Sequence, residues 1–235
     1  MLEMSFFLFY KKCRCQKMKA GQSKGVVIAL DIESRGMSPK KHGILSIGMC
    51  IGSAEEDLVL IKKRFDLEPL PGQQMEKRCQ DEFWSKHQDI YAILTQDPKP
   101  VKEVMTAFRA IIDKWHAVAE DVYLVSDNPA FDFGLLNYYL DEFDLLPLSY
   151  KRNKEGKPEY VALHDSDSYA RGALGQGFNA QWVNDTEVIK EHLHAQDTLN
   201  KDSHNHLPEK DAEFIYRLHY QVVNKSPLKR AKTSE

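Results

Sequence analysis

The first part of the chain consists of short apolar runs separated by polar turns, which is the pattern of β-strands. Residues 25–32 (GVVIALDI) form a continuous apolar, β-branched run, which predicts a strand buried on both faces. Two more strands are predicted at residues 44–52 and 57–67, with a turn-like segment at residues 52–57 between them. Because the links are short, we expect these three strands to form an antiparallel meander.

Helical periodicity follows these strands. Residues 81–94 have helical spacing, and after a proline-containing break residues 101–118 place their apolar side chains on one face, which predicts an amphipathic helix. Residues 207–223 repeat that pattern, with Pro208 near the start, and predict the last helix.

Between these helices, a short buried strand at residues 122–126 is expected to lead directly into a helix at residues 127–143. Asp127 or Asn128 can cap that helix, and Pro129 suits its first turn. The remaining segments are predicted to be a polar loop at residues 151–159, a weaker strand at residues 160–166, and mixed sequence at residues 173–205 with a helix around residues 185–196.

Length and composition indicate one globular domain with tails. The 235 residues are 42% hydrophobic and 29% charged, and the net charge of −3 argues against a surface that grips nucleic acid through general basicity. We expect an N-terminal extension at residues 1–24, either disordered or not translated, a domain at residues 25–223, and a disordered polar tail at residues 224–235.

The cysteines and the apolar segments bear on the compartment. The four cysteines have no zinc or redox spacing, and so few in a chain of this size favour a reducing, intracellular and cytoplasmic location. A basic stretch at residues 229–232 could serve as a nuclear address, although a solvated tail explains it much better. The apolar run near the N-terminus is too short to cross a bilayer, so no membrane partner is expected.

Asp31 and Glu33 are the first candidate functional residues, because they end the buried strand. The side-chain period of a strand is two, so both carboxylates point to the same face of the sheet. Oxygen-rich sites of this kind suit Mg²⁺ or Mn²⁺. Asp-x-Glu also occurs at three places without an apolar strand before it, namely Asp66/Glu68, Asp185/Glu187 and Asp211/Glu213.

Asp132 is the second candidate, in the first turn of the helix after the strand at residues 122–126. An aspartate there is also favoured by the helix dipole alone. If its strand packs beside the first strand, however, Asp132 comes close to Asp31.

His206 and Asp211 are the third pair, at the start of the last helix. A histidine on a loop has an ordinary pKa near 6.5 and suits a general base at neutral pH. The same spacing occurs at His116/Asp121 and His192/Asp197, and His204 lies close by, so the sequence leaves open whether His192 or His204 substitutes for His206. Together the four carboxylates and His206 suit a two-metal phosphodiesterase.

These three motifs, in this order, resemble those of the DEDDh superfamily of 3′–5′ exonucleases. ALDIES resembles the first motif, SDNPAFDFGLLN the second and HLPEKDA the third, and the compact size is most similar to the phage, viral and bacterial exoribonuclease-like branch. The resemblance implies a ribonuclease-H-like α/β fold, in which a five-stranded mixed sheet has three antiparallel strands followed by parallel strands, with helices on both faces. It makes residues 25–223 the exonuclease domain.

The resemblance also implies roles for individual residues. It implies that two ions, Mg²⁺ or Mn²⁺, are held by Asp31, Glu33, Asp132 and Asp211, and that His206 is the general base. Ser34 and Arg35 stand where many members have threonine-rich sequence that contacts the terminal nucleotide, so both are candidate substrate-binding residues.

The implied reaction is the release of nucleoside 5′-monophosphates from the 3′ end of single-stranded RNA or DNA. Phe133 or Trp84 could stack a base, although core packing is the usual role of buried aromatic residues. The alternatives are a catalytically silent nucleic-acid- or protein-binding module on the same fold, and an exoribonuclease specific for oligonucleotides. The sequence leaves the oligomeric state open, a homodimer included.

Overall fold

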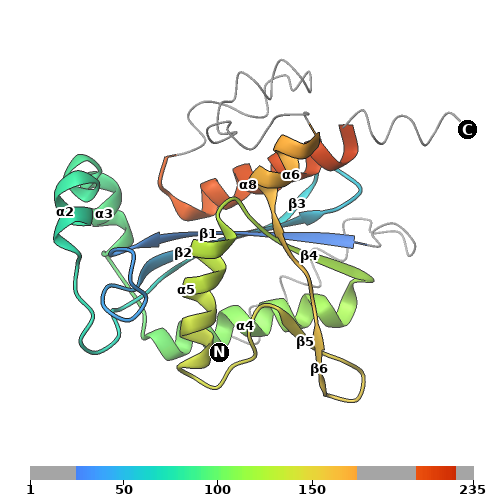
Figure 1. The fold of residues 1–235 in the computed structure, drawn as a ribbon, viewed down its shortest axis with the longest axis horizontal. Helices are drawn as coiled ribbons and strands as arrows, with labels where there is room; N and C mark the ends of the chain where they lie inside the picture. Colours follow the sequence, from blue (N-terminus) through green and yellow to red (C-terminus); the bar gives the residue numbers. More distant parts are fainter. Residues whose placement is uncertain (1–24, 174–204, 226–235) are drawn as a thin grey trace, which may run out of the picture.

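The structure is a computed structural model that describes residues 25–173 and 205–225. Its centre is a five-stranded sheet in the order β3-β2-β1-β4-β7 (Figure 1). The strands are β1 (Gly25–Ser34), β2 (Ile44–Ser53), β3 (Val59–Asp66), β4 (Asp121–Ser126) and β7 (Leu163–Asp165). Strands β1, β2 and β3 pair antiparallel, whereas β1, β4 and β7 pair parallel, so the predicted mixed sheet and its meander are confirmed.

Helices cover both faces of this sheet (Figure 1). Helices α4 (Val101–Val118) and α5 (Pro129–Asp141) pack on one face. Helices α6 (Ser166–Ala173) and α8 (Pro208–Lys225) lie on the other, where α8 crosses β1 and β2. The predictions of α4, α5 and α8 are confirmed, with α8 running two residues past its predicted end. None of the described helices is both long and apolar enough to cross a membrane.

The alternation of side chains along β1 decides what each face of the sheet contacts. Val26, Ile28 and Leu30 belong to the core cluster that includes the buried faces of α4 and α5. Val27 and Ala29 instead pack with the apolar residues of α8. Because side chains alternate between faces, the odd-numbered residues that follow, including Asp31 and Glu33, point toward α8.

The segment predicted as one helix at residues 81–94 is broken. It consists of α2 (Lys77–Glu82), the 3₁₀ turn η1 (Trp84–Lys86) and α3 (Gln88–Leu94). The break lies at Trp84, which is fully buried and whose Nε1 donates a 3.0 Å hydrogen bond to the carbonyl of Ser34. A continuous helix would give up the burial of this indole and its bond to the end of β1.

The predicted polar loop at residues 151–159 is in fact part of a β-hairpin. Strands β5 (Tyr150–Arg152) and β6 (Pro158–Tyr160) pair antiparallel. Gly156 at the turn has a φ of +78°, and the side chain of Asn153 accepts 2.9 Å hydrogen bonds from two backbone amides of the turn. Helix α6 was not predicted. The N-terminal extension, the helix around residues 185–196 and almost all of the polar tail lie outside the described residues.

Candidate active site

The C-terminal end of β1 lies under the start of α8, and a glycine makes this approach possible. Asp31 pairs with Gly48 across the antiparallel strands β1 and β2. A Cβ atom on Gly48 would lie only 1.9 Å from the carbonyl oxygen of Pro208, the first residue of α8. The first turn of α8, which carries Asp211, therefore rests directly on the backbone of β2 beside Asp31.

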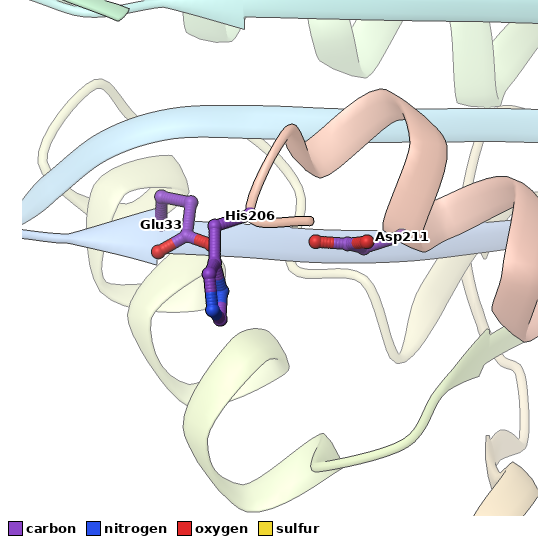
Figure 2. Close-up of side chains that lie close together, drawn as sticks. All are labelled: Glu33, His206 and Asp211. Carbon is purple, nitrogen blue, oxygen red and sulfur yellow. The ribbon is translucent and has the colours of Figure 1, made fainter. Parts of the chain in front are cut away.

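Glu33, His206 and Asp211 form a cluster at this point, as Figure 2 shows. Each offers one ligand atom, and these atoms lie within 4.8 Å of one another. The Nδ1 atom of His206 is 3.4 Å from Oε1 of Glu33. His206 has a left-handed backbone conformation, with a φ of +60°, and the preceding amide of Asn205 donates a 3.1 Å hydrogen bond to Oδ1 of Asp211. The loop before α8 is thus tied to the carboxylate.

Asp132 reaches the same region from α5. Its side chain is 3% exposed and accepts hydrogen bonds from the hydroxyl of Ser126, the last residue of β4, and from the backbone amide of Ile32 in β1. Parallel pairing of β1 with β4 brings these strand ends together. The sequence-based expectation that Asp132 lies beside Asp31 is therefore met by the geometry.

The carboxylates of this site are mutually repulsive. Burial raises the pKa of Asp31, and the negative charges of Asp132, Glu33 and Asp211 raise it further. Burial also raises the pKa of Asp132, with the hydrogen bond from Ser126 acting in the opposite direction.

One carboxylate oxygen of Asp31 is buried and accepts no hydrogen bond from the described residues. This atom is Oδ2, and the residue as a whole is 9% exposed. Buried carboxylates in this state are costly unless a cation compensates them. An all-oxygen set with one adjacent imidazole fits Mg²⁺ or Mn²⁺.

His206 contacts two aromatic side chains that the sequence did not indicate. Phe83 packs edge-to-face against its ring with centroids 4.7 Å apart, and His87 does the same at 4.5 Å. Burial lowers the pKa of His206, whereas the charge of Asp211 raises it. Phe83 and His87 flank the break between α2 and α3, so no spacing rule could have found them.

The predicted substrate-binding residues do not all face the site. Arg35 is 7% exposed and donates its guanidinium hydrogens to the carbonyls of Ile44 and Leu67, the latter at 2.7 Å. Phe133 is 3% exposed and belongs to the main core. Substrate contact is therefore the wrong role for these two side chains as the structure places them, because both are engaged inside the protein. Ser34 is half-buried beside Glu33, and its role stays a prediction.

Several rival matches to the motifs lie elsewhere. Asp121, the partner proposed for His116, pairs with Gly25 at the opposite end of β1 from Asp31. Glu213 forms ion pairs on the surface of α8 and β3, and Asp66 accepts a hydrogen bond from Ser46. The other rivals, Asp185/Glu187, His192/Asp197 and His204, lie outside the described residues.

Solved exonucleases share this arrangement of strands and helices. E. coli exonuclease I in complex with a dT13 oligonucleotide superposes with a TM-score of 0.56 and 15% identity, over 90% of this chain and 43% of that one. The nuclease domain of 3′hExo, a DEDDh family member bound to rAMP, superposes with a TM-score of 0.50 and 11% identity, over 86% of this chain and 93% of that one. A 3′-exonuclease that recognises the histone mRNA stem-loop superposes with a TM-score of 0.52 and 11% identity, over 87% of this chain and 85% of that one.

These comparisons establish the fold. At 11–15% identity, the predicted ribonuclease-H-like fold of the DEDDh exonucleases is confirmed, and the chain spans less than half of exonuclease I. No protein-family model matches the chain, and no curated protein matches it in sequence.

Proposed function

We propose that the protein is a metal-dependent 3′–5′ exonuclease that releases nucleoside 5′-monophosphates. The observation that carries this proposal is the meeting of Asp31, Glu33, Asp132 and Asp211, from three separate elements, beside His206. Several carboxylates buried together destabilise the folded protein unless a cation compensates their charge, so a bound cation best explains this group.

The four carboxylates would hold two Mg²⁺ or Mn²⁺ ions, because a set of carboxylate oxygens suits these cations. When bound, such ions supply Lewis-acid stabilisation of the charge that develops on the phosphate. His206 can take the proton of the attacking water, because burial keeps its imidazole neutral and Glu33 lies next to Nδ1. Phe83 and His87 restrict the ring to this orientation.

Single-stranded RNA or DNA with a 3′ end is the proposed substrate. The solved relatives in fold support this class, since one is bound to dT13, one to rAMP, and one recognises an mRNA stem-loop. The two serines beside the carboxylates are engaged: Oγ of Ser34 accepts a 3.2 Å hydrogen bond from the amide of Gly36, and the hydroxyl of Ser126 donates to Asp132. Attack by water therefore suits the site better than attack by a side chain.

The decisive experiment is a Mn²⁺- and Mg²⁺-titrated degradation assay on matched RNA and DNA labelled at the 5′ or the 3′ end. Stepwise shortening of the 5′-labelled strand, with immediate release of a labelled mononucleotide from the 3′-labelled strand, is expected. Asp132→Asn should abolish the reaction, whereas Asp141→Asn, an exposed position on the same helix, should leave it intact.

Three results would contradict the proposal. Full activity of Asp132→Asn would exclude a role for that carboxylate, and internal cleavage would exclude an exonuclease. Binding of the labelled strands without any cleavage at every metal concentration would instead support a catalytically silent module.

A further inference from the structure

The β5–β6 hairpin forms a two-stranded sheet of its own, separate from the five-stranded sheet. Figure 1 shows it extending beside α4, away from the end of β1 that carries the carboxylates. A hairpin of three residues per strand is marginal by itself in water, so other contacts must hold it.

Arg109 of α4 anchors the base of the hairpin. Its side chain is 3% exposed and pairs with Asp113 at 2.6 Å. The same guanidinium donates hydrogen bonds to the carbonyls of Leu146, Pro147 and Tyr150 at 3.2, 3.1 and 3.0 Å. A planar group with several donors fixes the chain where it enters β5, so the hairpin projects from a rigid base.

One face of the hairpin presents aromatic rings to solvent. Tyr150 and Tyr160 are directly opposite each other, with their rings edge-to-face and 6.1 Å between centroids. They are 38% and 71% exposed. A cross-strand pair of this kind stabilises a hairpin only modestly. Most of the Tyr160 surface nevertheless remains in water, where its ring is open to a flat ligand.

The hairpin is also locally basic in an acidic chain. Residues 150–160 contain four basic and two acidic side chains, although the whole chain carries a net charge of −3. Lys151 pairs with Glu159 at 3.9 Å and Lys157 with Glu155 at 2.9 Å. Within the described residues this leaves Arg152 and Lys154 without an ion-pair partner. By the two-residue period of a strand, Arg152 lies on the same face as Tyr150.

We propose that this hairpin is a docking arm for a single-stranded tract of nucleic acid. Tyr160 and Tyr150 would stack bases, and Arg152 and Lys154 would contact phosphates. Exposed rings interleaved with cations are the combination by which proteins bind single strands without reading their sequence. This docking arm rests on the proposed function, because the bound tract is part of the same strand whose 3′ end occupies the carboxylate site.

The arm predicts a dependence on substrate length. A strand of a few nucleotides bound at the carboxylates would not extend to the hairpin, whereas a long strand would contact both places. The hairpin thus contributes to the affinity for long strands and leaves the cleavage of short ones unchanged.

The test is fluorescence anisotropy with the full chain in EDTA, where no metal-dependent cleavage occurs. The probes are labelled single strands of about four and about thirty nucleotides. Tyr160→Ala should weaken the binding of the long strand about fivefold or more and leave that of the short strand unchanged, while Tyr160→Phe, which keeps the ring, should bind like the parent. Lys154→Gln should also weaken the binding of the long strand and make that binding less dependent on salt concentration. Lys102→Gln on α4 is the control and should change neither the affinity nor its salt dependence.

Long-strand affinity that is unchanged in both Tyr160→Ala and Lys154→Gln would overturn the docking arm. Equal losses for short and long strands would overturn it as well, because the effect would then not come from a tract beyond the 3′ end. Lys154 lies in the turn with an exposed side chain, so its variant keeps the test valid if Tyr160→Ala unfolds. Since binding is measured without metal, failure of the arm and failure of the exonuclease activity are recorded separately.

Discussion

Gly48 lies directly against the backbone of Pro208. A Cβ atom at position 48 would be 1.9 Å from the Pro208 oxygen and 2.6 Å from the amide nitrogen of Glu209. Because Gly48 also pairs with Asp31, this contact sets the distance between the first turn of α8 and the carboxylates of β1. One missing side chain thus determines whether Asp211 can join the site.

Gly48→Ala should therefore displace the start of α8. A misplacement near 1 Å can lower turnover about a hundredfold. Gly52→Ala is the matched control, because its Cβ would meet the ring of Tyr216 at 2.1 Å, farther along the same helix. Both variants should lose about 1–3 kcal/mol of stability by overpacking. Turnover and Mn²⁺ affinity should fall mainly in Gly48→Ala, and a larger loss in Gly52→Ala would contradict this role.

The centre of the sheet was predictable because β1 and β2 are buried on both faces. Hydrophobic runs identified β1 and β2, and periodicity identified α4 and α8. The hairpin was missed because its residues are exposed, so burial imposes no apolar pattern on β5 and β6. The break at Trp84 was missed because it depends on a hydrogen bond to Ser34, 50 positions away in the sequence.

The carboxylates were predictable for a related reason. Asp31 ends an apolar strand, and Asp132 and Asp211 lie in the first turns of α5 and α8, so the predicted order of strands and helices already places all three at element ends. Arg35 was assigned to the substrate because Ser34 and Arg35 stand where many members of the resembled superfamily contact the terminal nucleotide, but the direction of a side chain cannot be inferred from its position in a motif. Its guanidinium turns inward because the carbonyls of Ile44 and Leu67 lie within reach.

Asp31→Asn should stabilise the protein in EDTA and remove its stabilisation by Mn²⁺. The substitution removes one charge from a group of buried, mutually repulsive carboxylates, a gain on the order of 1 kcal/mol or more. It also removes a proposed metal ligand, so adding Mn²⁺ should no longer raise the melting temperature. Thermal unfolding with and without Mn²⁺ measures both effects, with Asp141→Asn as control. A variant that is less stable in EDTA but still stabilised by Mn²⁺ would contradict the assignment.

His206→Ala should lower kcat about 10²- to 10⁴-fold, the usual contribution of a general base. If His206 is a base and not a metal ligand, the Mn²⁺-induced rise in melting temperature should persist in this variant. His192→Ala serves as the control and should retain activity. A loss of activity in His192→Ala with none in His206→Ala would show that the third motif has been placed on the wrong histidine.

Arg35→Met should affect stability rather than substrate affinity. Loss of the guanidinium leaves the carbonyls of Ile44 and Leu67 buried without their donor, which costs about 2–4 kcal/mol. Lys40→Met, an exposed change of similar size in the same loop, should cost less than about 0.5 kcal/mol. Chemical denaturation measures the difference, and KM should stay unchanged. A raised KM at normal stability would restore the substrate-binding role.

His219 on α8 should make the stability depend on pH. Burial lowers its pKa to about 4, with a smaller effect of His164 on β7, while the ring of Tyr169 on α6 packs 5.8 Å away. Because the folded-state pKa lies below the unfolded value near 6.5, the stability is complete above pH 6.5 and is lost as the pH falls toward 4. Between pH 7 and pH 5 this one residue should lower the free energy of unfolding by about 2 kcal/mol.

Urea denaturation at both pH values should show a smaller decrease in His219→Leu than in the parent protein, since leucine cannot take up a proton. His116, whose pKa burial also lowers to about 4, should maintain a residual dependence in the variant. An identical decrease in the free energy of unfolding of both proteins would show that the packing of α8 against α6 does not keep His219 neutral.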